Sequence, residues 1–273
     1  MKPAALLIPA LIVNLGAFLW PVLNLASLAF RPVAPGGAIG TGWTWAIWAG
    51  LVEDSYYIEL VGHSCLVALG ITLLALVASY PLALFVHRAS PRWRNPLVVL
   101  CVAPLLISAV VRTYGWLVIL GDRGFVPSLL RSIGVAPPRL VFNETGVIIG
   151  LAEILMPYMI LSLLAGFGRL DPALEDAAAS LGAPPWTRFR RVVLPLTLPG
   201  IMLGCLLSFV LAVSSFITPK LLGGGRVNLL ATEIYDQAIV TLNWPVAAAL
   251  SIVVLVVFGL ALLVYGRVVR AVA

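Results

Sequence analysis

The chain of 273 residues is 62% hydrophobic and only 10% charged, and its mean hydropathy is +1.09. This composition excludes an ordinary soluble domain and indicates a polytopic membrane protein, so membrane spans rather than soluble domains are counted. The formal net charge of +6 would favour nucleic acid as the partner of a soluble protein. In a membrane protein the distribution of charge among the loops is informative instead, and we expect a lipid bilayer rather than nucleic acid around this chain.

Histidine and cysteine are sparse and show no spacing typical of a reactive or metal-binding site. His63 and His87 stand alone, without the neighbouring ligands that a zinc site or histidine-based catalysis needs. The cysteines lie within or at the edge of apolar runs, where small buried thiols are expected. They are Cys65, Cys101 and Cys205. We therefore expect no catalytic residue, no metal site and no cofactor in this chain.

The chain also lacks a phosphate-binding loop. Such a loop needs a lysine after its glycines to reach phosphate, and the only lysines are Lys2 and Lys220. Any ATP hydrolysis must therefore be supplied by another polypeptide.

Six apolar runs have the length of about 20 residues that a membrane-spanning helix needs. They are Ala4 to Phe30, Ser64 to Val86, Pro96 to Leu120, Gly146 to Phe167, Gly200 to Ile217 and Val246 to Val264. The first follows Lys2 like a signal peptide, but it is too long and lacks a cleavage site of small residues, so we interpret it as a span. The sequence thus predicts an all-α fold, with one transmembrane domain over residues 1–273.

An even number of spans puts both termini on one side, and the basic residues indicate which side. Ten Lys and Arg residues fall on the side of the termini and six on the other, with Arg112 inside a span. The ten are Lys2, Arg88, Arg92, Arg94, Arg169, Arg188, Arg190, Arg191, Arg267 and Arg270. The excess predicts cytoplasmic termini and a cytoplasmic loop over residues 168–199. The outer segment 31–63 is rich in Trp and Tyr, which is typical of chain at a membrane interface.

Two ionisable residues lie at similar depth in neighbouring spans. Arg112 is eight residues from Leu120 and Glu153 is seven from Gly146, so both are roughly 10 to 12 Å from the outer ends of their helices. Pro157 removes the hydrogen bond that the Glu153 carbonyl would accept, which leaves a carboxylate and a free backbone acceptor on one turn. A charge in the membrane needs a partner or water. We expect either a structural ion pair or a lining of a translocation path.

The cytoplasmic stretch from Asp171 to Gly200 predicts a short capped helix. Asp171 is a good N-cap, Pro172 suits the first helical position and Gly182 suits the C-terminal stop. Glu175 and Asp176 place negative charge near the positive end of the helix dipole. Pro185 then opens a second short helix, Trp186 to Leu194, before Pro195 and Pro199 lead into the next span.

The spacing in this stretch resembles a known motif. Asp176, Ala177 and Ala178 are followed after three residues by Gly182, and after nine more by Val192, one residue and Leu194–Pro195. This pattern resembles the EAA loop of permease subunits of bacterial ABC importers. The chain has Asp where Glu is usual and Val where Ile is usual, and Glu175 offers a second carboxylate beside Asp176.

Further segments resemble the permeases of spermidine and putrescine importers. They are SYPLALFV, VRTYGWLVIL, MPYMILSL, FITPKLLGG and WPVAAALS. The resemblance implies a type I importer in the bacterial inner membrane, with a second permease subunit, identical or homologous. Two ATPase subunits that bind ATP and Mg²⁺ would contact Glu175, Asp176, Ala177, Ala178 and Gly182, and a periplasmic binding protein would meet the outer loops. A polyamine or related amine is the favoured cargo, and related permeases carry opines, aminophosphonates, thiamine or ferric iron.

Two other classes of function fit the sequence less well. An ion-coupled secondary transporter could use Arg112 and Glu153, but such proteins show internal symmetry and several intramembrane charges, and no repeat is seen in this chain. An integral membrane enzyme needs a cluster of reactive side chains at an interface, and the sequence shows none.

Overall fold

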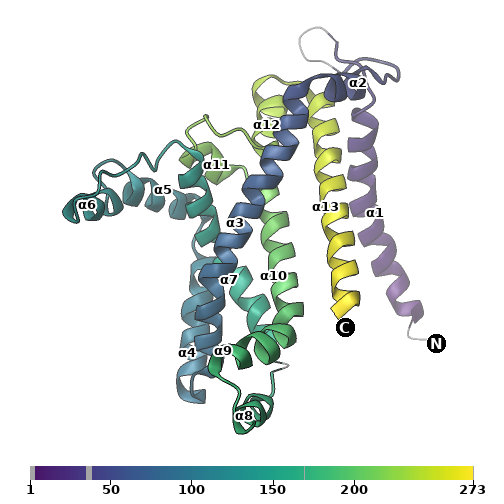
Figure 1. Ribbon diagram of the computed structural model, residues 1–273. Helices are drawn as coiled ribbons and strands as arrows, with labels where there is room; N and C mark the ends of the chain where they lie inside the picture. Colours follow the sequence, from purple (N-terminus) through teal and green to yellow (C-terminus); the bar gives the residue numbers. More distant parts are fainter. Residues whose placement is uncertain (1–3, 35–38, 169, 273) are drawn as a thin grey trace. The chain divides into compact units, whose positions relative to one another are not determined.

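The computed structural model describes residues 4–34, 39–168 and 170–272. In these ranges the regular secondary structure is helical apart from one isolated bridge between Val33 and Ile39 (Figure 1). The helices in chain order are α1 (Ala4–Leu28), α2 (Ala46–Glu53), α3 (Ser55–Arg88), α4 (Pro91–Val102), α5 (Ala109–Leu120), α6 (Phe125–Ser132), α7 (Glu144–Phe167), α8 (Pro172–Ser180), α9 (Pro185–Arg188), α10 (Leu194–Ser214), α11 (Ile217–Leu222), α12 (Leu230–Tyr235) and α13 (Trp244–Val272). Lys2 and Arg169, two of the charges counted for topology, lie outside the described residues.

Four of the described helical segments are long and apolar enough to cross a membrane. They are Ser55–Arg88, Glu144–Phe167, Pro185–Ser214 and Trp244–Arg270. A bent pair, Pro91–Leu106 with Ala109–Ser132, supplies a fifth if it counts as one span. The all-helical membrane fold is therefore confirmed, with four or five such spans among the described residues.

The expected continuous span from Pro96 to Leu120 is instead broken near its middle. After α4, the 3₁₀ turn Ala103–Leu106 leads to Ile107, whose φ of −96° and ψ of 132° are extended. Ser108 then caps α5 by accepting a hydrogen bond from the Val110 amide at 3.3 Å. The two halves meet at an angle of 95°. Pro104 has no amide proton and its ring crowds the preceding turn, and the chain there tightens into the 3₁₀ turn that ends at Leu106.

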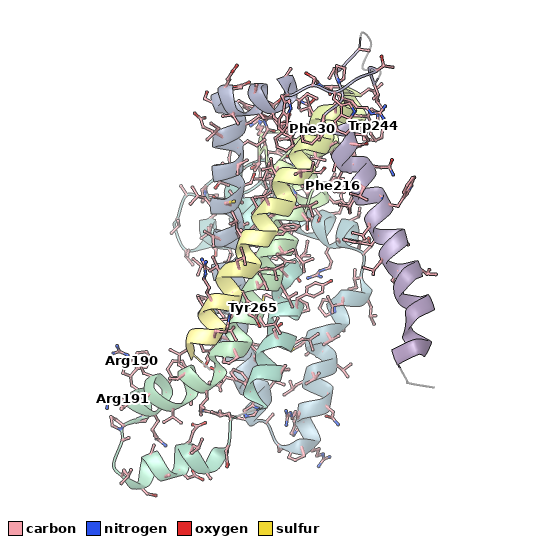
Figure 2. The ribbon with its side chains drawn as sticks, turned by 90° about the vertical axis from the view of Figure 1, so that its right-hand side faces the viewer. Phe30, Arg190, Arg191, Phe216, Trp244 and Tyr265 are labelled. Atoms are coloured by element: carbon pink, nitrogen blue, oxygen red, sulfur yellow. The ribbon has the colours of Figure 1, made fainter. Side chains whose placement is uncertain are left out.

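The second short helix expected from Trp186 to Leu194 is instead the beginning of a membrane-spanning helix. α9 continues through a π-helical turn, Phe189–Val193, into α10. At that turn the Leu194 amide donates to the Phe189 carbonyl, five residues earlier. The wider turn gives Pro195 room without ending the helix, because π turns relax the backbone where an α-helical hydrogen bond cannot form. Arg190 and Arg191 on this turn are exposed (Figure 2).

The chain groups into two compact units, Gly62–Leu229 with Phe258–Ala273, and Met1–Val61 with Leu230–Val257. In the first, α7 and α10 pack through glycine: a Cβ on Gly166 would lie 2.7 Å from the Gly200 Cα. Small residues at such a crossing let membrane helices approach closely. In the second unit, the Phe30 ring lies 4.9 Å from Trp45 and 5.7 Å from Trp48 between ring centroids.

Candidate functional sites

The helix α8 has the capped start that its sequence predicts. The Asp171 Oδ1 accepts a hydrogen bond from the Ala173 amide at 2.9 Å, which satisfies one of the amides that the first turn leaves without a partner. Glu175 lies in the first turn, where the helix dipole favours negative charge.

The end of α8 is a complete Schellman motif. Gly182 has a φ of +78°, and its amide donates to the Ala179 carbonyl at 2.9 Å while the Ala183 amide donates to the Ala178 carbonyl at 3.1 Å. This left-handed backbone favours glycine, since other residues pay a steric cost there. The predicted stop at Gly182 is therefore confirmed. Leu181, which precedes it, is 88% exposed.

The predicted coupling residues differ in exposure along α8. Asp176 and Ala177 are exposed, Ala178 is half-buried and Glu175 is half-buried. Glu175 does not face solvent freely, because its Oε2 accepts a hydrogen bond from the Arg88 Nη2 at 2.8 Å. The structure thus gives the two adjacent carboxylates different surroundings. Their roles toward an ATPase stay predictions.

Arg112 of α5 and Glu153 of α7 are in contact. The Arg112 Nη2 donates to the Glu153 Oε1 at 2.7 Å and to the Glu153 carbonyl oxygen at 2.9 Å. That carbonyl is the one that Pro157 deprives of its helical donor, so the guanidinium replaces the missing bond. The Arg112 side chain is 9% exposed and that of Glu153 is 35% exposed. The charge is therefore mostly paired within the protein, as a low-dielectric environment requires.

Two further groups complete this polar cluster, and sequence reasoning missed both. The Trp116 Nε1 donates to the Glu153 Oε2 at 3.0 Å, and the Arg112 Nη1 reaches the Pro104 carbonyl oxygen at 3.5 Å. Trp116 is four residues after Arg112, so both lie on the same face of α5. This spacing in the sequence could have indicated that Trp116 joins the cluster. The Pro104 carbonyl carried no signal, because its availability depends on the break before α5. Arg112 thereby joins both sides of the break to α7.

A cavity of about 450 Å³ opens beside this cluster. Its lining includes Ile107 and Ser108 at the break, Arg112, and Tyr158 of α7. Leu106, also in the lining, is 89% exposed. The cavity therefore combines apolar side chains with a hydroxyl, a phenol and a guanidinium.

The described residues contain no group of three or more His, Cys, Asp and Glu side chains arranged to hold a metal ion.

The chain resembles proteins of known function over most of its length. A family model described as "Binding-protein-dependent transport system inner membrane component" matches residues 79–273. The spermidine/putrescine transport system permease protein PotB of Escherichia coli strain K12 is 38% identical over 216 residues, which cover 78% of each chain. The corresponding protein of Haemophilus influenzae is 38% identical over 213 residues, 77% of this chain and 74% of that protein.

A solved structure shares the fold. It is a bacterial alginate ABC transporter in complex with an alginate pentasaccharide-bound periplasmic protein, and the match has a TM-score of 0.73. The match covers 98% of this chain and 94% of that one at 18% sequence identity. At this identity the likeness shows the fold alone.

Proposed function

Because the chain belongs to the family of inner membrane components of binding-protein-dependent transport systems, we propose that separate ATPase subunits drive it through α8. The chain is a multi-pass permease subunit of an ABC importer and is not itself the ATP-hydrolysing component.

The proposed topology has six crossings. The four long helices and the bent pair supply five, and α1, with 25 residues, supplies the sixth, since a helix of that length reaches about 37 Å at a rise of 1.5 Å per residue. Both termini and α8 then face the cytoplasm. The exposed arginines at the junction of α3 and α4 and on the π-helical turn support this orientation, because basic residues concentrate on the cytoplasmic side. They are Arg88, Arg92, Arg94, Arg190 and Arg191.

The observation that carries the coupling proposal is the short, doubly capped helix α8, whose exposed Asp176 and Ala177 stand at the EAA positions. Small side chains allow close approach of a partner surface, and Asp176 offers it a carboxylate. The Schellman turn at Gly182 ends the helix sharply, so α8 forms a compact projection. In this proposal two ATPase subunits bind α8 of this chain and of a second permease subunit. Closure of the ATPases around ATP moves both helices and opens the path toward a periplasmic binding protein.

Substitutions on α8 test this coupling. Ala177→Asp adds charge to the exposed face. Gly182→Trp adds bulk at a site with no atom within 4 Å of a built Cβ, and it also strains the left-handed backbone of the Schellman turn. In proteoliposomes with the complete transporter, both variants should keep ATP hydrolysis and lose uptake. Ala173→Asp, also exposed on α8, is the matched control and should retain uptake. Uptake at the wild-type rate in both Ala177→Asp and Gly182→Trp would refute the coupling role.

The proposed path lies along the cavity beside Arg112. Its support is the combination of a break in a spanning helix, a guanidinium and a partly exposed Glu153. Non-helical backbone within a membrane is tolerated where it is buried or lines a water-filled space.

The proposed cargo is a polyamine, and its support is the name and 38% identity of the two permease relatives. Glu153 adds little to this assignment, because Arg112 and Trp116 already engage both of its carboxylate oxygens. The test is calorimetry on the cognate binding protein with spermidine, putrescine, thiamine and ferric iron. Binding of a polyamine alone supports the assignment, whereas binding of thiamine or iron alone contradicts it.

A further inference from the structure

Glu175 is held by the chain itself rather than offered to a partner. Its side chain is 21% exposed, whereas the neighbouring residues Leu174, Asp176 and Ala177 of α8 are exposed. The partner is Arg88, the last residue of α3, whose Nη2 lies 2.8 Å from the Glu175 Oε2. The two residues are 87 positions apart in sequence, so this contact joins a spanning helix to the short cytoplasmic helix.

A cavity of about 350 Å³ lies where α8 and the end of α3 meet, lined by His87, Arg88, Leu170, Glu175 and Asp176. α8 also contacts α9 and the π-helical turn. The Arg88–Glu175 pair is an ionic link across this space.

The helix dipoles favour the pairing of Arg88 with Glu175 rather than with Asp176. Glu175 lies in the first turn of α8 and Arg88 in the last turn of α3, so each charge also complements the dipole of its own helix. Asp176 lines the same cavity but is itself exposed, and no ion pair is seen for it among the described residues. The structure therefore separates the two carboxylates: one faces inward to Arg88 and one remains available.

We propose that Arg88 and Glu175 are positioning residues that tie α8 to α3, so that displacement of α8 by an ATPase is transmitted to a membrane-spanning helix. Asp176 is then the carboxylate that meets the ATPase. This proposal rests on the coupling role of α8. It adds a second route of transmission to the direct one, in which α8 moves α9 and α10 through the chain connection.

The test is the amount of substrate imported per ATP hydrolysed by the complete transporter in proteoliposomes. Arg88→Gln and Glu175→Gln should each lower this ratio about 2- to 5-fold, the range that an exposed ion pair typically contributes to an equilibrium. The exchanged variant Arg88→Glu with Glu175→Arg restores opposite charges but sets each against the dipole of its helix, so it should recover only part of the ratio. Arg92→Gln is the matched control, since Arg92 is exposed on α4, and it should match the wild type.

The ratio does not depend on how much complex assembles, so a folding defect does not imitate the expected result. Wild-type ratios in both single variants, or an exchanged variant with a ratio no higher than that of the single variants, would overturn the proposal. The coupling role itself is tested separately by Ala177→Asp. If that variant uncouples and the Glu175 variant does not, only the link to α3 is refuted; if neither does, the role of α8 is refuted as well.

Discussion

Replacing Arg112 by Gln is expected to destabilise the permease more than replacing Glu153 by Gln. The Arg112 guanidinium donates to the Glu153 carboxylate and carbonyl and reaches the Pro104 carbonyl, so its removal takes a donor from the Glu153 Oε1 and carbonyl oxygen and leaves the carboxylate without its counter-charge. Breaking a buried ion pair costs about 3 to 5 kcal/mol. Glu153 is 35% exposed, so water compensates in part and we expect about 3 kcal/mol for Arg112→Gln, near the lower end of that range.

Glu153→Gln should cost less, because Arg112 keeps the two carbonyl acceptors and the amide oxygen of Gln can still accept from it. The double variant should be more stable than the sum of the single effects predicts, by about 1 to 3 kcal/mol of coupling energy, since it leaves no charge unpaired. The assay is the melting temperature of the purified transporter in detergent, measured for all four proteins of the cycle. Additive effects within about 0.5 kcal/mol would refute the pairing as a source of stability.

The same four proteins separate a structural role from a role in the path. If Arg112 and Glu153 only stabilise the broken helix, uptake by the double variant should return together with its stability. If they also line the path, stability should return while uptake stays low. Uptake in proteoliposomes, normalised to the amount of assembled transporter, decides between the two.

Three further outcomes are expected. Gly200→Ala should destabilise the transporter by an overpacking cost of about 1 to 3 kcal/mol and lower its melting temperature, because the new Cβ would lie 2.7 Å from the Gly166 Cα. Gly259→Ala, whose Cβ would have no atom within 4 Å, should leave the melting temperature unchanged. Equal melting temperatures for the two variants would contradict the packing argument. Asp171→Ala should weaken the α8 cap by about 1 kcal/mol and speed proteolysis of the intact transporter after α7, whereas an unchanged cleavage rate would contradict the cap. A cysteine at Arg92, in a background without native cysteines, should react with an impermeant maleimide in inside-out vesicles only; labelling in right-side-out vesicles would reverse the topology.

Local signals in the sequence predicted local structure well. The cap at Asp171 and the stop at Gly182 depend on residues within a few positions of each other, and the structure contains both. Four of the six predicted spans, or five with the bent pair, were found because burial in lipid demands long apolar runs. Their ends were less predictable: α3 begins at Ser55 rather than Ser64, since an amphipathic or aromatic extension of a helix leaves no sharp change in hydropathy.

The non-local features could be predicted only in part. Equal depth in the membrane predicted that Arg112 and Glu153 could pair, and the structure places them in contact. The break after Pro104 and the continuous helix through Pro195 could not be told apart from sequence, because proline permits either a bend or a π turn according to the packing around it. The Arg88–Glu175 pair is beyond any spacing rule, since it depends on how α8 folds back toward α3.

We propose that this permease moves its substrate with energy supplied by a separate ATPase. The most direct measurement is uptake of radiolabelled spermidine into proteoliposomes that contain the permease pair and receive the binding protein outside, with and without the ATPase subunits and ATP inside. Uptake should require both the ATPase and ATP, and should persist when ion gradients are collapsed. Uptake without the ATPase, driven by an imposed ion gradient, would contradict the account.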